Sequence, residues 1–172
     1  NGWDIDLQGH QRRVGHILGI CGGYQMLGKK IHDPDGIEGP PRTVSGLGYL
    51  NVETVISPKK NLSLINAFTI ESYVPVSGYE IHMGQTSGPD CDRNWLRLPN
   101  RNEGAMNGSR DVRGSYLHGL FNSDVFRSEF LSNLGAASNL VSYQADIEKT
   151  LDELGEFIEK HLDVNKLISL CS

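Results

Sequence analysis

The stretch that decides the fold lies at residues 14–28 and reads Val14-Gly15-His16-Ile17-Leu18-Gly19-Ile20-Cys21-Gly22-Gly23-Tyr24-Gln25-Met26-Leu27-Gly28. Its first half, Val14–Ile20, is a short apolar run that leads into glycines, which is typical of a buried strand in a parallel sheet. Tyr24–Lys30 then predicts a helix. A strand, a tight turn and a helix in this order predict an α/β fold.

The composition predicts a soluble globular protein. The 172 residues suit one domain, so we expect residues 1–172 to fold as a single unit. No apolar run approaches the roughly 18 residues that a membrane span needs. The formal charge is −5, and no basic stripe is longer than the pairs Arg12-Arg13 and Lys59-Lys60. We therefore expect neither a nucleic acid nor a membrane as a partner.

The cysteines and the first residues give two further expectations. Cys21, Cys91 and Cys171 are odd in number and widely spaced, without a secretory signal before them, which predicts a reducing, cytoplasmic location. The chain begins at Asn1 rather than Met, and its first predicted helix, Trp3–Val14, has no earlier strand to pack against. We expect a fragment of a longer protein.

Beyond residue 28, the sequence predicts a loop, a β-rich middle and a helical end. Asp33–Pro41 is rich in Pro and Gly and predicts the loop. Extended, partly alternating segments predict strands in the middle, at Leu47–Ile56, Tyr79–Met83, Trp95–Leu98 and Val112–Leu117. Ser123 can cap a helix that Gly135 ends, and Tyr143–His161 predicts a second helix with an apolar stripe. We expect an α/β sheet with an antiparallel extension.

The turn itself has the form G-x-C-x-G, from Gly19 to Gly23, which is the cysteine counterpart of a nucleophile elbow. A thiol at the start of a helix lies where the helix dipole favours the thiolate. The N–H of Gly22 would point at the oxygen of a bound carbonyl and supply one oxyanion donor. The alternative is that Cys21 is a small buried hydrophobic residue and the glycines only permit tight packing.

A nucleophilic cysteine needs a base, and the chain has six histidines. His118 follows the strand-like run Gly114–Leu117, so it would lie at the same sheet edge as Cys21 if the two strands are parallel. The alternative is a loop histidine with a structural hydrogen bond. His16, within the predicted buried strand, is interpreted as a core histidine, and His161, at a helix C-terminus, as structural.

Four blocks in a fixed order are more specific than the turn alone. They are Gly19–Gly28, Asp33–Gly39, Ser77–Gly84 and Gly114–Phe121. Together they resemble the glutaminase region of cobyric acid synthases, which are class I (triad-type) glutamine amidotransferases, and the resemblance covers residues 2 to about 131. It implies a flavodoxin-like α/β sheet that lacks its N-terminal strand or strands, in the C-terminal part of a longer synthetase.

The resemblance also implies the chemistry. Cys21 would attack the side-chain amide of glutamine and form a thioester, while His118 moves protons and ammonia leaves. Gly22, Gly23 and Gln25 would bind the oxyanion or the substrate, with a solvent-facing helix residue as the alternative for Gln25. No metal or cofactor is expected in this region. The family's synthetase domain is expected to use ATP and Mg²⁺ to amidate the corrinoid adenosylcobyrinic acid a,c-diamide in cobalamin biosynthesis.

Two departures from the family pattern limit what the resemblance implies. Many relatives carry a Glu two residues after the histidine, where this chain has Leu120, so the site is a dyad unless another segment supplies the third member. Glu80 and His82 share one face of their predicted strand and are candidates for site support or a domain contact, with a solvated strand face as the alternative. The strand and loop that provide the second oxyanion donor are absent, so weak or no activity is expected of the fragment alone.

Two other functions stay open at this point. One is the glutaminase subunit of a ligase that amidates cell-wall lipid precursors, which has a similar Cys-Gly-Gly-Tyr-Gln stretch; the Gly78–Gly84 block favours the corrinoid enzyme. The other is a non-catalytic docking module in which the elbow survives only as architecture.

Overall fold

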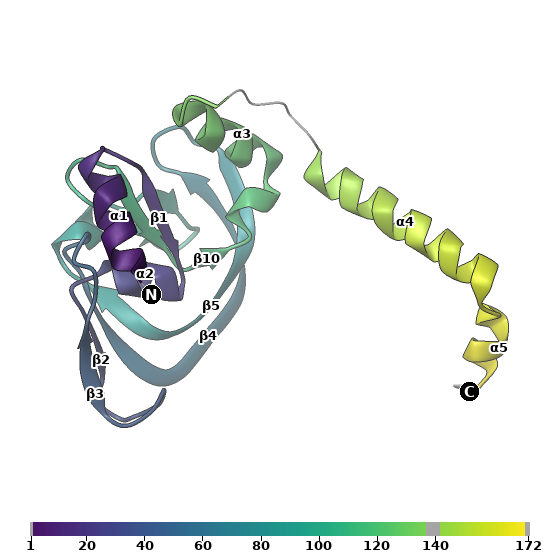
Figure 1. Ribbon diagram of the computed structural model, residues 1–172, viewed down its shortest axis with the longest axis horizontal. Helices are drawn as coiled ribbons and strands as arrows, with labels where there is room; N and C mark the ends of the chain where they lie inside the picture. The colour runs from purple at the N-terminus through teal and green to yellow at the C-terminus, as the bar shows by residue number, and fades with distance from the viewer. Residues whose placement is uncertain (1, 137–141, 171–172) are drawn as a thin grey trace.

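The computed structural model describes residues 2–136 and 142–170, and for residues 59–61 the backbone only. Its front end follows the predicted order, with α1 at Trp3–Arg12, β1 at Ile17–Ile20 and α2 at Gly22–Leu27. β1 pairs in parallel with β9, Val112–Ser115, and β8, Ala105–Met106, completes this small sheet on the far side of β9. The α/β prediction is confirmed (Figure 1).

The predicted start of the strand and the predicted end of the helix are both wrong. The strand begins at Ile17 rather than Val14, because Val14 has a positive φ of 59° and lies exposed. His16 is exposed and precedes the strand, so its interpretation as a core histidine is wrong. The helix ends at Leu27 because Gly28 is extended, and Lys30 already begins the next strand.

The second sheet confirms the antiparallel extension. Its strands lie in the order β10-β5-β4-β2-β3, and only β2 and β4 pair in parallel. Their bounds are β2 Lys30–Asp33, β3 Arg42–Ser45, β4 Glu53–Thr69, β5 Pro75–Ser87 and β10 Leu117–His118. Two short strands, β6 at Leu96–Arg97 and β7 at Asn102–Glu103, extend it from β4. The long antiparallel pair β4–β5 forms a curved ribbon along one side of the body (Figure 1).

Two predicted strands differ from the structure in ways that matter for the site. Leu50 and Val52 are buried as predicted, but they lie in a loop, and β4 begins at Glu53 and continues to Thr69. The predicted strand Val112–Leu117 is two strands, because the chain leaves β9 after Ser115 and joins β5 as β10. This switch carries the chain from the small sheet to the large one.

The C-terminal helices match their sequence signals closely. α3 spans Asp124–Asn133, and Ser123 caps it by accepting a hydrogen bond from the N–H of Phe126. Gly135 follows the helix with a φ of 80°. α4 spans Tyr143–His161 as predicted, and a short α5, Val164–Ser169, comes after it.

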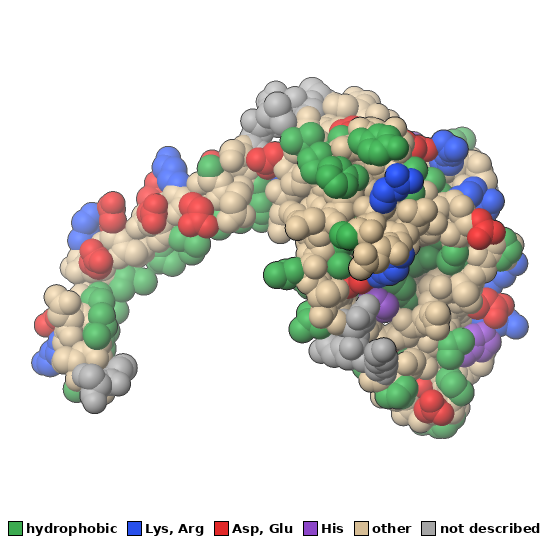
Figure 2. Space-filling model, turned by 180° about the vertical axis from the view of Figure 1, so that it is seen from behind, with side chains coloured by type: hydrophobic (Ala, Val, Ile, Leu, Met, Phe, Trp, Pro, Cys, Tyr) green, Lys and Arg blue, Asp and Glu red, His purple; other side chains and the backbone are tan. Residues whose placement is uncertain are grey.

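The apolar stripe of α4, in contrast, does not pack on the sheet. Among the residues that the structure describes, Leu151, Leu154 and Phe157 are each more than half exposed. α4 and α5 extend from the body as an arm (Figure 1), and their apolar side chains line the side of the arm that faces the body across a hollow (Figure 2). The periodicity therefore predicts the helix, but it does not predict which surface its apolar stripe packs against.

Candidate active site

Cys21 sits in a strained turn between β1 and α2. Its φ of 54° and ψ of −116° are unusual for a residue with a side chain, and such a conformation costs of order 1–3 kcal/mol and is common at functional sites. Cys21 N–H donates to the Ser115 carbonyl at 2.9 Å, which ties the turn to β9. A Cβ at Gly19 would lie 2.8 Å from the backbone of Gly23, so the turn needs a glycine there. The predicted strained elbow is confirmed.

Gly22 and Gly23 begin α2, and a Cβ on either would meet open space. Packing therefore does not require glycine at these two positions. Their N–H groups belong to the first turn of the helix, where backbone donors have no partner within the helix. A bare backbone at this place leaves room for a bound group to approach those donors.

Cys21 and Gln25 both lie along one edge of β5. The Cys21 thiol donates to the Ile81 carbonyl at 3.4 Å, and Gln25 Nε2 donates to the Met83 carbonyl at 3.3 Å. Gln25 Nε2 also donates to the Tyr116 hydroxyl at 3.2 Å. Gln25 is buried, so the solvent-facing alternative for this residue is wrong. Its amide nitrogen links α2 to β5 and to the residue that precedes β10.

His118 occupies the same edge of β5, in β10. It pairs with Tyr79, and the two rings stack with centroids 5.0 Å apart and planes 7° from parallel. Its Nε2 is buried and has no hydrogen-bond partner among the residues that the structure describes. A Cβ at Gly78 would lie 1.9 Å from the His118 carbonyl oxygen, so glycine allows β10 to approach β5 closely.

The register places Cys21 and His118 next to each other along β5. His118 pairs with Tyr79, and the Cys21 thiol contacts the carbonyl of Ile81, two residues on, which is about 7 Å along a strand. Cys21 directly follows β1, whereas His118 lies in β10 of the large sheet and not at the end of the parallel strand β9, so the expected position of His118 at a parallel strand end is wrong. The two side chains share no hydrogen bond, because the thiol donates to Ile81 and the His118 Nε2 has no partner.

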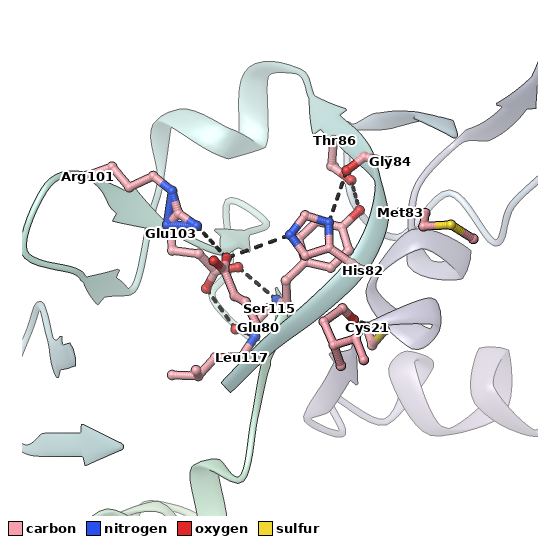
Figure 3. A network of polar contacts seen from close by, with 12 residues as sticks. Cys21, Glu80, His82, Met83, Gly84, Thr86, Arg101, Glu103, Ser115 and Leu117 are labelled. Carbon is pink, nitrogen blue, oxygen red and sulfur yellow. Dashed lines mark hydrogen bonds and ion pairs between the residues drawn. The ribbon is translucent and has the colours of Figure 1, made fainter. Parts of the chain in front are cut away.

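Glu80 and His82 point to the other face of β5 and join a buried polar network (Figure 3). Glu80 is only 2% exposed and forms an ion pair with Arg101, while its carboxylate lies 3.8 Å from His82 Nε2. The His82 ring stacks on Tyr116 with centroids 3.8 Å apart. His82, and then Arg101, hold the pKa of the Glu80 carboxyl below its usual value, although burial acts in the opposite direction. The solvated-face alternative is wrong.

Comparison with known proteins matches the CobB/CobQ-like glutamine amidotransferase domain to residues 1–126. The chain belongs to this family. It is 57% identical to the cobyric acid synthase of Ruegeria sp. and 52% identical to those of Bradyrhizobium diazoefficiens and Rhodobacter capsulatus, each over 98% of the chain. The match spans 35% of the length of each relative. The resemblance read from the four sequence blocks is confirmed.

Two residues after the histidine, where the resemblance implies a Glu as third member of a triad, this domain has Leu120. Leu120 is 1% exposed and packs in an apolar cluster with Leu117, Phe126 and Trp95. In the part of the chain that the structure describes, no carboxylate bonds to the His118 ring, whose contact is the stacked Tyr79. The described residues therefore offer a cysteine and a histidine without an orienting acid.

Sequence reasoning missed Glu103, which supports the switch from β9 to β10. Its buried carboxylate accepts from the Ser115 hydroxyl at 2.7 Å and from the Tyr116 N–H at 2.8 Å. The Ser115 hydroxyl in turn accepts from the Leu117 N–H at 2.9 Å. Burial raises the pKa of Glu103, while the hydrogen bonds from Tyr116 and Ser115 lower it. Glu103 comes from a polar stretch without periodicity, so no pattern singles it out.

The remaining cysteines and the membrane question complete the description of the domain. Cys91 lies beside Tyr24, with 3.7 Å between its sulfur and the hydroxyl, and burial raises the pKa of its thiol. Cys171 lies outside the described residues. In the ranges 2–136 and 142–170, no helix is both long and apolar enough to cross a membrane.

Proposed function

We propose that this chain hydrolyses glutamine and supplies ammonia, with Cys21 as nucleophile and His118 as the proton carrier. The observation that carries the proposal is the edge of β5, where a strained Cys21 and a His118 with an unpartnered Nε2 lie about two residues apart. Nucleophilic catalysis by cysteine needs a thiol and a nearby base, and Cys21 and His118 are the two groups of this kind that meet along β5.

The reaction runs in two steps. His118 accepts the proton of the Cys21 thiol, the resulting thiolate attacks the side-chain amide carbon of glutamine, and the N–H groups of Gly22 and Gly23 stabilise the oxyanion. His118 donates a proton to the leaving nitrogen, so that ammonia departs and a thioester remains. Water, deprotonated by His118, then attacks the thioester and releases glutamate and the thiol. Gln25, already fixed to β5, would hold the substrate from the helix side through its remaining acceptor.

His118 has to move towards Cys21 for these proton transfers. Its Nε2 makes no hydrogen bond, so a rotation of the ring breaks no polar contact at that atom. The thiol gives up one hydrogen bond, to Ile81, at 3.4 Å. Catalytic hydrogen bonds that are absent in a free enzyme often form only in the complex with substrate.

The larger reaction is that of a cobyric acid synthase. The relatives bear this name, and they are about three times as long as the matched region, since the match spans 35% of each. In this proposal, a synthetase part preceding this domain uses ATP and Mg²⁺ to amidate carboxylates of adenosylcobyrinic acid a,c-diamide with the ammonia released here. The reaction would take place in the cytoplasm. The isolated 172-residue chain is expected to be weakly active or inactive.

A full-length chimera tests the proposal. Residues 1–172 replace the matching region of the Ruegeria sp. cobyric acid synthase, and ammonia release from glutamine is measured together with ATP-dependent corrinoid amidation. We expect both activities in the chimera, a loss of ammonia release of about 1,000-fold or more in Cys21→Ala, and a loss of at least 100-fold in His118→Ala. His161→Ala, on the exposed arm, is the matched histidine control and should leave the rate unchanged.

Other outcomes would overturn the proposal in distinct ways. Ammonia release that persists in Cys21→Ala would show that this thiol is not the nucleophile. A correctly folded chimera that releases no ammonia would favour a non-catalytic docking module. Ammonia release with amidation of a cell-wall lipid precursor, but not of the corrinoid, would identify the other amidating ligase.

A further inference from the structure

The β4–β5 ribbon has one face that packs on the core and one that does not. We call the second the outer ribbon face, and it consists of Leu62, Leu64, Asn66 and Phe68 from β4 with Pro75, Ser77, Tyr79 and Ile81 from β5. Ala67 and Val76, on the opposite face, are each 2% exposed, whereas Leu64 is 91% and Leu62 68% exposed. Directly paired residues share a face, so these eight side chains form one continuous surface.

The outer ribbon face has the composition of an interface. None of its eight residues is charged, although 22% of the chain is Asp, Glu, Lys or Arg. Depletion of charge with retention of aromatic and aliphatic groups is typical of the centre of a protein–protein interface. A contiguous exposed apolar surface on a folded domain commonly marks a site of interaction.

This face runs directly into the candidate active site. Leu64 pairs with Tyr79, Tyr79 pairs with His118, and the Tyr79 and His118 rings stack. Two residues further along each strand, Leu62 pairs with Ile81, whose carbonyl accepts the hydrogen bond of the Cys21 thiol. A protein domain bound to the outer ribbon face would therefore contact Tyr79 and Ile81, which lie next to His118 and Cys21.

The arm adds a second apolar surface on the same side of the molecule. The β4–β5 ribbon lies on the side of the body towards which α4 extends (Figure 1), and the apolar side chains of α4 line the hollow between arm and body (Figure 2). Leu151, Leu154 and Phe157 are among the exposed apolar side chains of α4.

We propose that the outer ribbon face is the surface on which the ammonia-accepting synthetase part docks, an inference that rests on the proposed function. Ammonia that escapes into neutral water is protonated and ceases to be a nucleophile, so it has to reach the acceptor without crossing bulk water, which requires a synthetase part docked close to this site. Most of the length of the relatives lies outside this chain, since the match spans 35% of each. A second copy of the chain on this face would cover His118 without bringing an acceptor.

The full-length chimera with a Leu64→Glu substitution tests this inference. The new carboxylate would lie in the proposed contact, and burying a charge without a partner weakens an interface strongly. We expect glutamine-supported amidation to fall at least tenfold, while ammonium-supported amidation and ammonia release from glutamine stay within about twofold. Leu62→Glu, on the same face, should behave alike. Val14→Glu, an exposed position far from the ribbon in sequence, is the matched control and should change none of the three rates.

The outcomes separate this inference from the function on which it rests. An unsubstituted chimera that releases no ammonia would overturn the proposed function and the docking surface together. A chimera in which Leu64→Glu and Leu62→Glu leave amidation fully coupled to glutamine hydrolysis would overturn the docking surface alone. If these substitutions instead abolish a dimer of the chain in sedimentation experiments and leave coupling intact, the face is a contact between copies, and the inference is wrong.

Discussion

The two faces of β5 differ, because one lies in a buried polar network and the other meets the candidate active-site residues. On one face, Glu80 and His82 are enclosed in a network with Arg101. On the other, Tyr79 stacks on His118, and at the strand edge Ile81 meets Cys21. Because successive side chains along a strand point to opposite faces, neighbouring residues of β5 have different surroundings. Substitutions at adjacent residues of β5 should therefore affect different properties, with the free energy of unfolding changed on one face and the rate of ammonia release on the other.

The largest expected effect on stability comes from Gly78 of β5, where β10 approaches β5 most closely. In Gly78→Ala, the new Cβ would lie 1.9 Å from the His118 carbonyl oxygen, so β10 must shift, at a cost of about 3 kcal/mol. We expect a lower urea midpoint of unfolding and a large loss of ammonia release in the chimera. Gly108→Ala, where a Cβ meets open space, is the control. An unchanged midpoint in Gly78→Ala would mean that β10 does not pack as described.

The buried face of β5 should be costly to alter. Glu80→Ala leaves Arg101 and His82 without their carboxylate, and since Arg101 is partly exposed we expect a loss of about 2 kcal/mol rather than the full cost of a buried pair. Urea unfolding measures it. Glu159→Ala, on the exposed side of the arm, should change stability by less than about 0.5 kcal/mol. Equal effects of the two substitutions would contradict the network.

The contributions of Glu80 and Glu103 to the free energy of unfolding should change with pH in opposite directions. The pKa of Glu80 is lowered in the folded state, so its contribution is present above the unfolded value of about 4.5 and is lost as the pH falls through the folded value. The pKa of Glu103 is raised, so stability should decline as the pH rises above the unfolded value. Glu103→Gln should remove that decline, and Glu80→Gln the loss in acid. Thermal unfolding at a series of pH values measures both slopes.

The smallest effect on stability is expected on the outer ribbon face. Leu64 is 91% exposed, so Leu64→Ala should change the free energy of unfolding by less than about 0.5 kcal/mol. Its neighbour Ile65, which packs against the core, should cost about 2 kcal/mol or more when truncated to Ala. Chemical denaturation of the two variants compares them directly. Similar losses would show that the two faces of the ribbon are not distinct.

The parts of the fold with strong local signals were predictable from the sequence. The apolar run, the G-x-C-x-G turn, the cap at Ser123 and the stripe of Tyr143–His161 each specify a structure through nearby residues, and each is present. Long-range pairing was not predictable. The single predicted strand at Val112–Leu117 divides because Glu103 holds the Tyr116 backbone, and that carboxylate gives no periodic signal.

The site was predictable in its residues but not in its environment. The turn singles out Cys21 and the strand-like run before His118 singles out that histidine, but the structure brings the two together along β5, because β10 pairs with β5 and does not continue β9. Their contacts depend on which backbone carbonyls β5 leaves free beyond β10, which only the assembled sheet determines. The burial of Gln25 and Glu80, and the contacts of His82 with Glu80 and Tyr116, were not predictable for the same reason. Each reads as a polar residue on a surface until the neighbouring element is in place.

The proposed function requires that Cys21 is a nucleophile and that His118 activates it. The direct measurement is labelling of the 172-residue chain with a diazo-ketone analogue of glutamine, followed by mass spectrometry of the peptides that contain Cys21, Cys91 and Cys171. We predict modification of Cys21 well ahead of the other two, slowed at least tenfold in His118→Ala and unchanged in His161→Ala. Equal labelling of the three thiols, or a rate at Cys21 that does not depend on His118, would contradict the account.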